Sequence, residues 1–170
     1  MRLQTQGAES PHVEAAEAHA ASPGLVSSIE AMARSRLLTV GVQAPVVEVA
    51  ALLSSAQISV VVVCDAYGVP LGSITETDLV RRLGMGQANF FTARAGEVMG
   101  NSFTTCKPSD LLSEVLAMMH RLGLIHVLLV DDHNKLLGVV NARDGLRALL
   151  AAGNHEEALL RNYVMGVGYQ

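Results

Sequence analysis

Thr75 and Asp78 stand three residues apart in the stretch GSITETDLV, where a strand pattern gives way to a helix pattern. A hydroxyl and a carboxylate at this spacing form a capping box, in which each side chain bonds the backbone N–H of the other residue. The same groups, beside the unpaired N–H groups of a helix start, are also suited to holding a ligand. Asn141 and Asp144 repeat the arrangement 66 positions later in GVVNARDGL. A local cap has no reason to recur at a fixed interval, so both pairs are candidate binding residues.

The interval of 66 residues extends well beyond these two motifs. Residues 39–83 align with residues 105–149 without a gap, and eleven of the aligned positions are identical. Many other aligned positions exchange one apolar residue for another. Self-similarity at a fixed period indicates a duplicated structural unit.

Each copy begins with the same predicted elements. A short strand at 37–42 or 103–107 precedes a helix, and Pro45 or Pro108 suits the start of that helix. Apolar residues then recur at helical spacing on one helix face: Val46, Val49, Ala50 and Leu53 in the first copy, and Leu112, Val115, Leu116, Met119 and Leu122 in the second. This periodicity predicts that one face of each helix belongs to the core.

The second half of each copy is a predicted hairpin followed by a helix. The unbroken apolar runs in ISVVVVCD and LIHVLLVDD indicate strands covered on both faces. Gly68 and Asn134 occupy aligned positions in the following turns, where a positive φ is tolerated. The next strand pairs back on its predecessor, and a helix begins at Thr75 or Asn141. We therefore predict an α/β (α+β) fold of two tandem β-α-β-β-α repeats, packed sheet to sheet about a pseudo-two-fold axis with clefts between them.

These patterns also set the expected boundaries along the chain. We expect a mobile leader at 1–26, the first repeat at 27–86, the second at 87–152, and a C-terminal helix and tail at 153–170. The leader has weak periodicity and lacks the apolar segment of a secretory signal. The C-terminal helix begins near residue 154 and carries an apolar face expected to cover a neighbour: Ala158, Leu159, Tyr163 and Val164.

Charge, hydropathy and cysteine content argue against several classes of protein. The formal charge of −4, without a Lys/Arg cluster, argues against a nucleic-acid or anionic-membrane partner. The longest apolar runs fall far short of the ~20 residues that a membrane-spanning helix needs. Cys64 and Cys106 form no CxxC motif, so we expect reduced thiols in a cytoplasmic protein, with no metal site. Asp131, Asp132 and His133 read as a solvated turn.

The ordered set of motifs resembles the CBS-domain pair, or Bateman module. The resemblance rests on GEVM at 96–99, a weaker IEAM at 29–32, and the junctions GSITETD and GVVNARD, and it covers about residues 28–150. It implies an adenosine-containing ligand in the clefts between the repeats. AMP, ADP or ATP is the first expectation, with NAD or S-adenosylmethionine as alternatives.

The resemblance also implies composite sites, in which the junction motif of one repeat faces the first two strands of the other. The first cleft would contain Thr75, Asp78, Thr104, Thr105, Cys106, Ile125 and His126. The second cleft would contain Asn141, Asp144, Thr39, Val40, Ile58, Ser59 and Val60, with Arg143 at the helix start as a further candidate.

The chemistry of such a ligand suggests a role for each group. Asp78 and Asp144 would accept hydrogen bonds from the two neighbouring hydroxyls of a ribose. Thr75, His126 and a helix N-terminus would supply donors for phosphate, with Arg143 as another cation. The residues that would line an apolar slot for adenine are Val40, Ile58, Ile125 and Cys106.

Simpler explanations of the same residues stay open. Thr75 and Asp78 form a capping box whether or not they bind a ligand. His126 lies inside an apolar strand, where a buried histidine bonded to a backbone carbonyl is the alternative to a ligand contact. Asn141 replaces the hydroxyl of Thr75 with an amide, so we expect two unequal sites.

The sequence contains no nucleophile with an evident base and no P-loop, so we predict a protein that is not an enzyme. We expect a regulatory, signal-transducing module that senses an adenine nucleotide and acts on an effector protein supplied in trans. The alternative is a ligand-free scaffold for dimerisation or for a partner protein. A homodimer is expected in either case, because the resemblance implies paired chains.

Overall fold

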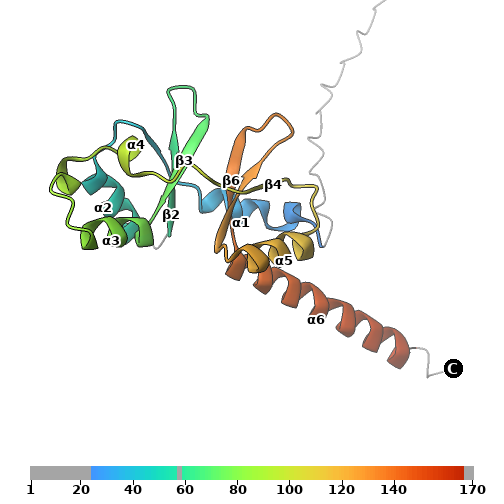
Figure 1. Ribbon diagram of the computed structural model, residues 1–170. Coiled ribbons are helices and arrows are strands. Elements are labelled where there is room, and N and C mark those ends of the chain that lie inside the picture. Colours follow the sequence, from blue (N-terminus) through green and yellow to red (C-terminus); the bar gives the residue numbers. More distant parts are fainter. Residues whose placement is uncertain (1–23, 57–58, 167–170) are drawn as a thin grey trace, which may run out of the picture.

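The computed structural model describes residues 24–56 and 59–166. Residues 1–23, which make up most of the predicted leader, lie outside the described residues, as do residues 167–170 and the candidate site residue Ile58. Figure 1 shows two lobes, each with a small sheet on its inner side and helices on its outer side. The inner sheets face one another, as expected for two repeats packed sheet to sheet.

The β-α-β-β-α order is confirmed in both copies. The first repeat consists of β1 (Thr39–Gly41), α2 (Val46–Ala56), β2 (Val60–Cys64), β3 (Pro70–Thr75) and α3 (Glu76–Gly84). The second repeat consists of β4 (Thr105–Cys106), α5 (Leu112–Leu122), β5 (His126–Val130), β6 (Leu136–Asn141) and α6 (Ala142–Gly166). Short lead-in segments precede the repeats: η1 (Val26–Ile29) with α1 (Glu30–Ser35), and η2 (Phe90–Thr92) with α4 (Ala95–Val98).

The two sheets have the same topology and register. Each is three-stranded, with order β1-β2-β3 or β4-β5-β6, a parallel first pair and an antiparallel second pair. Thr39 lies opposite Val62, and Thr105 lies opposite Leu128, so the register repeats at the interval of 66 residues. The turn residues Gly68 and Asn134 adopt φ of 80° and 59°, which confirms the positive φ predicted for both turns.

The central strands are buried on both faces. Alternate residues of β2, among them Val61 and Val63, pack against the helices of the first repeat. The residues between them on β2 meet β5 and β6 of the second repeat in an apolar layer between the sheets: Val60, Val62, Cys64, Leu128 and Val139. This layer packs the two repeats together and explains why polar and apolar residues do not alternate along β2 and β5.

Each lead-in segment packs on the repeat that it does not precede. In Figure 1, α1 lies with the second lobe and α4 with the first. Val26, predicted to be the last residue of the mobile leader, is instead fully buried in the core of the second repeat with Ile29 and Ala33. A Cβ at Gly138 on β6 would lie 2.6 Å from the carbonyl carbon of Ala33, so α1 contacts the sheet backbone directly.

Two helix boundaries differ from the sequence-based expectation. Pro108 does not start the second helix, because the chain first turns at 108–110 and α5 begins at Leu112. The separate helix expected from residue 154 is wrong, since α6 runs unbroken from Ala142 to Gly166 and extends away from both lobes (Figure 1). The side chains expected to form its apolar face lie outside the described residues, so that face remains a prediction.

Candidate functional site

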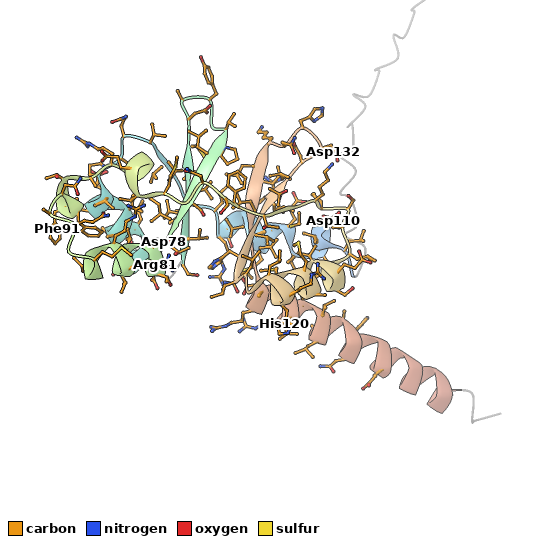
Figure 2. The ribbon with its side chains drawn as sticks, viewed as in Figure 1. Asp78, Arg81, Phe91, Asp110, His120 and Asp132 are labelled. Carbon is orange, nitrogen blue, oxygen red and sulfur yellow. The ribbon has the colours of Figure 1, made fainter. Side chains whose placement is uncertain are left out.

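Thr75 and Asp78 form the capping box predicted from their spacing. The Thr75 hydroxyl accepts from the Asp78 backbone N–H at 3.2 Å, and Asp78 Oδ2 accepts from the Thr75 N–H at 3.0 Å and from the Thr75 hydroxyl at 2.6 Å. The other oxygen, Oδ1, lies 3.7 Å from an Arg81 nitrogen. Figure 2 shows Asp78 and Arg81 together on α3. Because the cap uses only Oδ2, Asp78 retains an oxygen that can accept from a ligand.

A pocket of about 630 Å³, here the Asp78 pocket, opens beside this cap. Its lining from the first repeat includes Thr75, Glu76, Thr77, Asp78 and Arg81, and its lining from the remainder of the chain includes Ser102, Thr104, Ile125 and His126. The structure therefore brings together five of the seven residues expected in the first cleft. Thr105 is exposed, and Cys106 is buried in the core of the second repeat, so neither lines this pocket.

A second pocket of about 380 Å³, the Asp144 pocket, lies beside the second junction. It is lined by Arg36, Ser59, Val60, Ile125, His126, Val139, Asn141, Arg143 and Asp144. The expected partners Ser59 and Val60 are present, but Thr39 and Val40 are not. Those two line a separate pocket of about 420 Å³ with Cys64 and Asp65, so their assignment to this cleft is wrong.

The second junction does not form a capping box. Asn141 Oδ1 accepts from the Arg143 backbone N–H at 2.8 Å, which confirms Asn141 as a helix cap. Asp144 turns away from this cap and receives Nε and Nη2 of Arg36 at 2.9 and 3.2 Å. The Asp144 side chain is only 6% exposed, whereas that of Asp78 is 29% exposed. The two aligned aspartates thus have different environments.

Arg36 is one of the lining residues that the sequence analysis missed, and Val139, Glu76, Arg81 and Ser102 are others. Arg36 follows α1, lies 108 positions before Asp144, and reaches it only because α1 packs on the second repeat. The interval of 66 residues held a usable signal, since position 102 is the counterpart of position 36 and Ser102 lines the Asp78 pocket. The aligned positions 36 and 102 therefore each line one pocket, with an arginine in one case and a serine in the other.

Ser59 and His126 join the two repeats between the pockets. The Ser59 hydroxyl and His126 Nε2 are 2.6 Å apart, and both residues line both pockets. The expected alternative for His126, a bond to a backbone carbonyl, is wrong because the partner is a hydroxyl. Burial, with a smaller contribution from Arg36, lowers the pKa of His126, which favours the neutral imidazole.

The hairpin turns account for the acidic residues outside the pockets. Asp131 Oδ1 accepts from the backbone N–H groups of His133 and Lys135, each at 2.8 Å, and Asp132 pairs with Lys107 at 2.9 Å. Asp131 and its neighbours thus form a turn, as predicted. Across residues 24–56 and 59–166, no group of three or more His, Cys, Asp or Glu side chains could hold a metal ion.

No helix in the described part of the chain is both long enough and apolar enough to cross a membrane. Both cysteines are free thiols in buried positions. Burial, followed by the charge of Asp110, raises the pKa of Cys106 to about 12. Burial and the charge of Asp65 also raise the pKa of Cys64. Both thiols are therefore poor nucleophiles in the folded protein.

Comparisons with known proteins agree with this architecture. A curated relative, an uncharacterized protein of Methanopyrus kandleri, is 28% identical over 120 residues, which cover 71% of this chain and 61% of that protein. A CBS-domain containing protein from Agrobacterium tumefaciens has a similar structure, with a TM-score of 0.67 and 25% identity over 74% of this chain and 93% of that chain.

A further similar structure is the CBS domain pair of protein MJ0100 in complex with 5′-methylthioadenosine and S-adenosyl-L-methionine. It has a TM-score of 0.63 and 23% identity over 72% of this chain and 97% of that chain. The family model of the CBS domain matches residues 26–84 and 95–151. The first match runs from η1 to the end of α3, and the second runs from α4 into α6. With both copies matched, and with their sheets packed as described, the chain belongs to the CBS domain family as a tandem pair.

Proposed function

We propose that this protein is a non-catalytic regulatory module that binds an adenosine-containing ligand in the Asp78 pocket. One observation carries the proposal: an aspartate with a spare carboxylate oxygen lies beside a pocket of about 630 Å³ that both repeats build. That volume is within the range of ordinary small-molecule sites. AMP, ADP and ATP are the first candidates, followed by NAD and S-adenosylmethionine.

The lining residues supply the groups that such a ligand needs. Asp78 Oδ1 accepts from the ribose hydroxyls, while Oδ2 keeps the helix cap. Glu76 and Thr77 stand at the first turn of α3, where backbone N–H groups lack intrahelical partners and can donate to a phosphate. Ile125 from the second repeat supplies apolar surface for adenine.

Regulation follows from the composite lining of the pocket. A ligand that contacts α3 and the second repeat together favours whichever arrangement of the two repeats closes best around it. The exposed apolar side chains of the junction helices, Val80, Leu83, Leu146 and Leu150, supply surface for a homodimer or an effector protein acting in trans. The buried free thiols agree with a reducing, cytoplasmic setting.

Calorimetric titration of the purified protein with each candidate ligand tests the proposal. Asp78→Asn keeps the side-chain size and the Thr75 cap but removes the charge that favours ribose binding, so it should weaken binding about tenfold or more. Asp132→Asn is the matched control, because Asp132 lies on the distant hairpin turn (Figure 2). Absence of binding for all five ligands at millimolar concentration would refute the proposal, as would an Asp78→Asn variant that binds like the wild type.

A ligand-free scaffold is the second candidate function. It is favoured by the cap itself, because the Thr75 and Asp78 bonds already give both residues a structural role. Sedimentation of the protein with and without AMP distinguishes the two functions. A scaffold assembles identically in both cases, whereas a sensor changes its assembly or its partner binding when the ligand is present.

A further inference from the structure

The two aligned aspartates differ in how many carboxylate oxygens they can offer to a ligand. Asp78 uses Oδ2 for its helix cap, and its Oδ1 lies 3.7 Å from Arg81, which is too long for a hydrogen bond. Asp144 accepts from Arg36 on both oxygens, at 2.9 and 3.2 Å, and its side chain is buried. One carboxylate is therefore open to a ribose, and the other already has a partner.

A single aligned position accounts for this difference. At the interval of 66 residues, Arg81 on α3 corresponds to Arg147 on α6, so both junction helices carry the same arginine. Arg36, in contrast, corresponds to Ser102, which lines the Asp78 pocket. A serine has no charge and a single hydroxyl, so it cannot make the forked contact that Arg36 makes.

The lead-in helix α1 holds Arg36 in place. The Arg36 backbone N–H donates to the carbonyl groups of Met32 and Ala33, each at 3.2 Å, where α1 ends. Ala33 is buried against β6, so closely that a Cβ at Gly138 would meet its carbonyl group. Because these contacts fix the backbone of α1, the guanidinium reaches Asp144 from an anchored position and needs no ligand to bring it there.

A ribose would have to displace this guanidinium to reach Asp144. The contact that would be lost is forked and joins two opposite charges, whereas the hydroxyl groups of a ribose are neutral donors. Removal of the guanidinium would also leave the carboxylate of a 6% exposed side chain without its counter-charge. The exchange is therefore unfavourable, although no backbone group blocks the pocket lining at Asp144.

We infer that Arg36 limits the protein to one adenosine site, because its guanidinium takes the position at Asp144 that a ribose would need. The inference rests on the proposed function, since it concerns a second site for the same class of ligand. Arg36 is then a specificity-determining residue that comes from outside the junction motif. Its effect is on the number of ligands bound, because it lines the Asp144 pocket and is not part of the Asp78 pocket.

The number of AMP molecules bound per chain, measured by calorimetry up to millimolar ligand, tests the inference. Wild type should bind one, and Arg36→Ser, which copies the residue at the aligned position 102, should bind two. Adding Asp144→Asn to Arg36→Ser should remove the second site. Arg34→Ser is the matched control and should bind one, because Arg34 also lies on α1 but pairs with Glu30 and is outside both pocket linings.

An Asp78→Asn background separates this inference from the proposed function. Adding Arg36→Ser to Asp78→Asn should strengthen AMP binding about tenfold, by opening the second carboxylate. That gain supports the inference even if Asp78→Asn alone binds like the wild type, a result that would refute the Asp78 assignment. One AMP in the wild type and still one in Arg36→Ser overturns the inference and leaves the proposed function intact, as does a second site that also appears in Arg34→Ser.

Arg36→Ser leaves the Asp144 carboxylate without its partner, so circular dichroism at the titration temperature must confirm the fold. If that variant unfolds, Arg36→Lys takes its place, because a lysine keeps the charge but cannot occupy both oxygens in a fork. Arg36→Lys should show a second, weaker AMP site. A folded Arg36→Lys that binds a single AMP would then overturn the inference.

Discussion

Replacing Arg36 with alanine should lower the free energy of unfolding, and the geometry of its ion pair with Asp144 determines by how much. Two guanidinium nitrogens bond the two oxygens of Asp144, whose side chain is 6% exposed. Removing one partner of a fully buried ion pair costs about 3–5 kcal/mol, because the remaining charge is left uncompensated. The Arg36 side chain is 34% exposed, so water can enter the vacated space, and we expect a loss near the lower limit, about 3 kcal/mol.

Replacing the other partner, Asp144, should cost less stability than replacing Arg36, so comparing the two substitutions tests the reasoning. Asp144→Ala leaves a guanidinium that is already one-third exposed and can be hydrated, so the loss should be about 1 kcal/mol. Since the guanidinium is no longer needed once the carboxylate is gone, the double variant should resemble Asp144→Ala instead of showing the sum of both losses. Arg36→Lys keeps the charge without the fork and should fall between wild type and Arg36→Ala.

Urea unfolding at neutral pH, followed by circular dichroism, measures these free energies from the midpoint and the slope. An unchanged slope across the four variants indicates that the same surface unfolds in each, which makes their free energies comparable. The reasoning is refuted if the two single variants lose the same stability, or if their losses add in the double variant. Either result means that Asp144 is adequately solvated without Arg36.

Three other predictions concern the core and the histidine between the pockets. Gly138→Ala should lower the free energy of unfolding by about 1–3 kcal/mol, because the added Cβ would meet the α1 backbone. Gly153→Ala, with open space around the added Cβ, should raise it by about 0.5–1 kcal/mol. Equal shifts of the two variants in thermal melts would contradict this. Both thiols should resist alkylation at pH 8 until the protein unfolds, since burial raises the pKa of Cys106 to about 12; rapid native labelling would disprove it. Burial lowers the pKa of His126, so the unfolded state binds the proton more readily and stability should fall as the pH drops from about 6.5 through the native pKa. Urea unfolding at several pH values should show a shallower fall in His126→Gln than in a His120→Gln control.

Local patterns and the repeat interval were sufficient to predict the framework of the fold. Apolar spacing along the chain located α2 and α5, and the unbroken apolar runs located β2 and β5. The Thr75–Asp78 box was predictable because its partners are three residues apart and need no tertiary contact. The prediction of unequal clefts rested on Asn141 alone, because its amide cannot reproduce the bonds of a threonine hydroxyl at that position.

Contacts between distant segments were the part that sequence reasoning did not reach. The misplaced residues all belong to the first strand of a repeat, and none lines the pocket expected for it: Thr39, Val40, Thr105 and Cys106. Which side chains of a short strand face a cleft depends on how the two sheets pack, and a strand of two or three residues carries too little alternation to reveal it. Arg36 was missed for a related reason, because it reaches Asp144 only when α1 packs on the second repeat, which it does not directly precede.

The preserved aspartate and the changed positions around it explain one another. Because Arg36 pairs with a carboxylate buried at the start of α6, loss of either partner is unfavourable, and loss of the arginine more so. Asp144 therefore has a structural role at its aligned position, while Asp78 keeps an accessible oxygen. Ser59 and His126 bond one another between the pockets and line both. A ligand in either pocket would thus contact the same hydrogen bond, which is a physical route for coupling the two pockets.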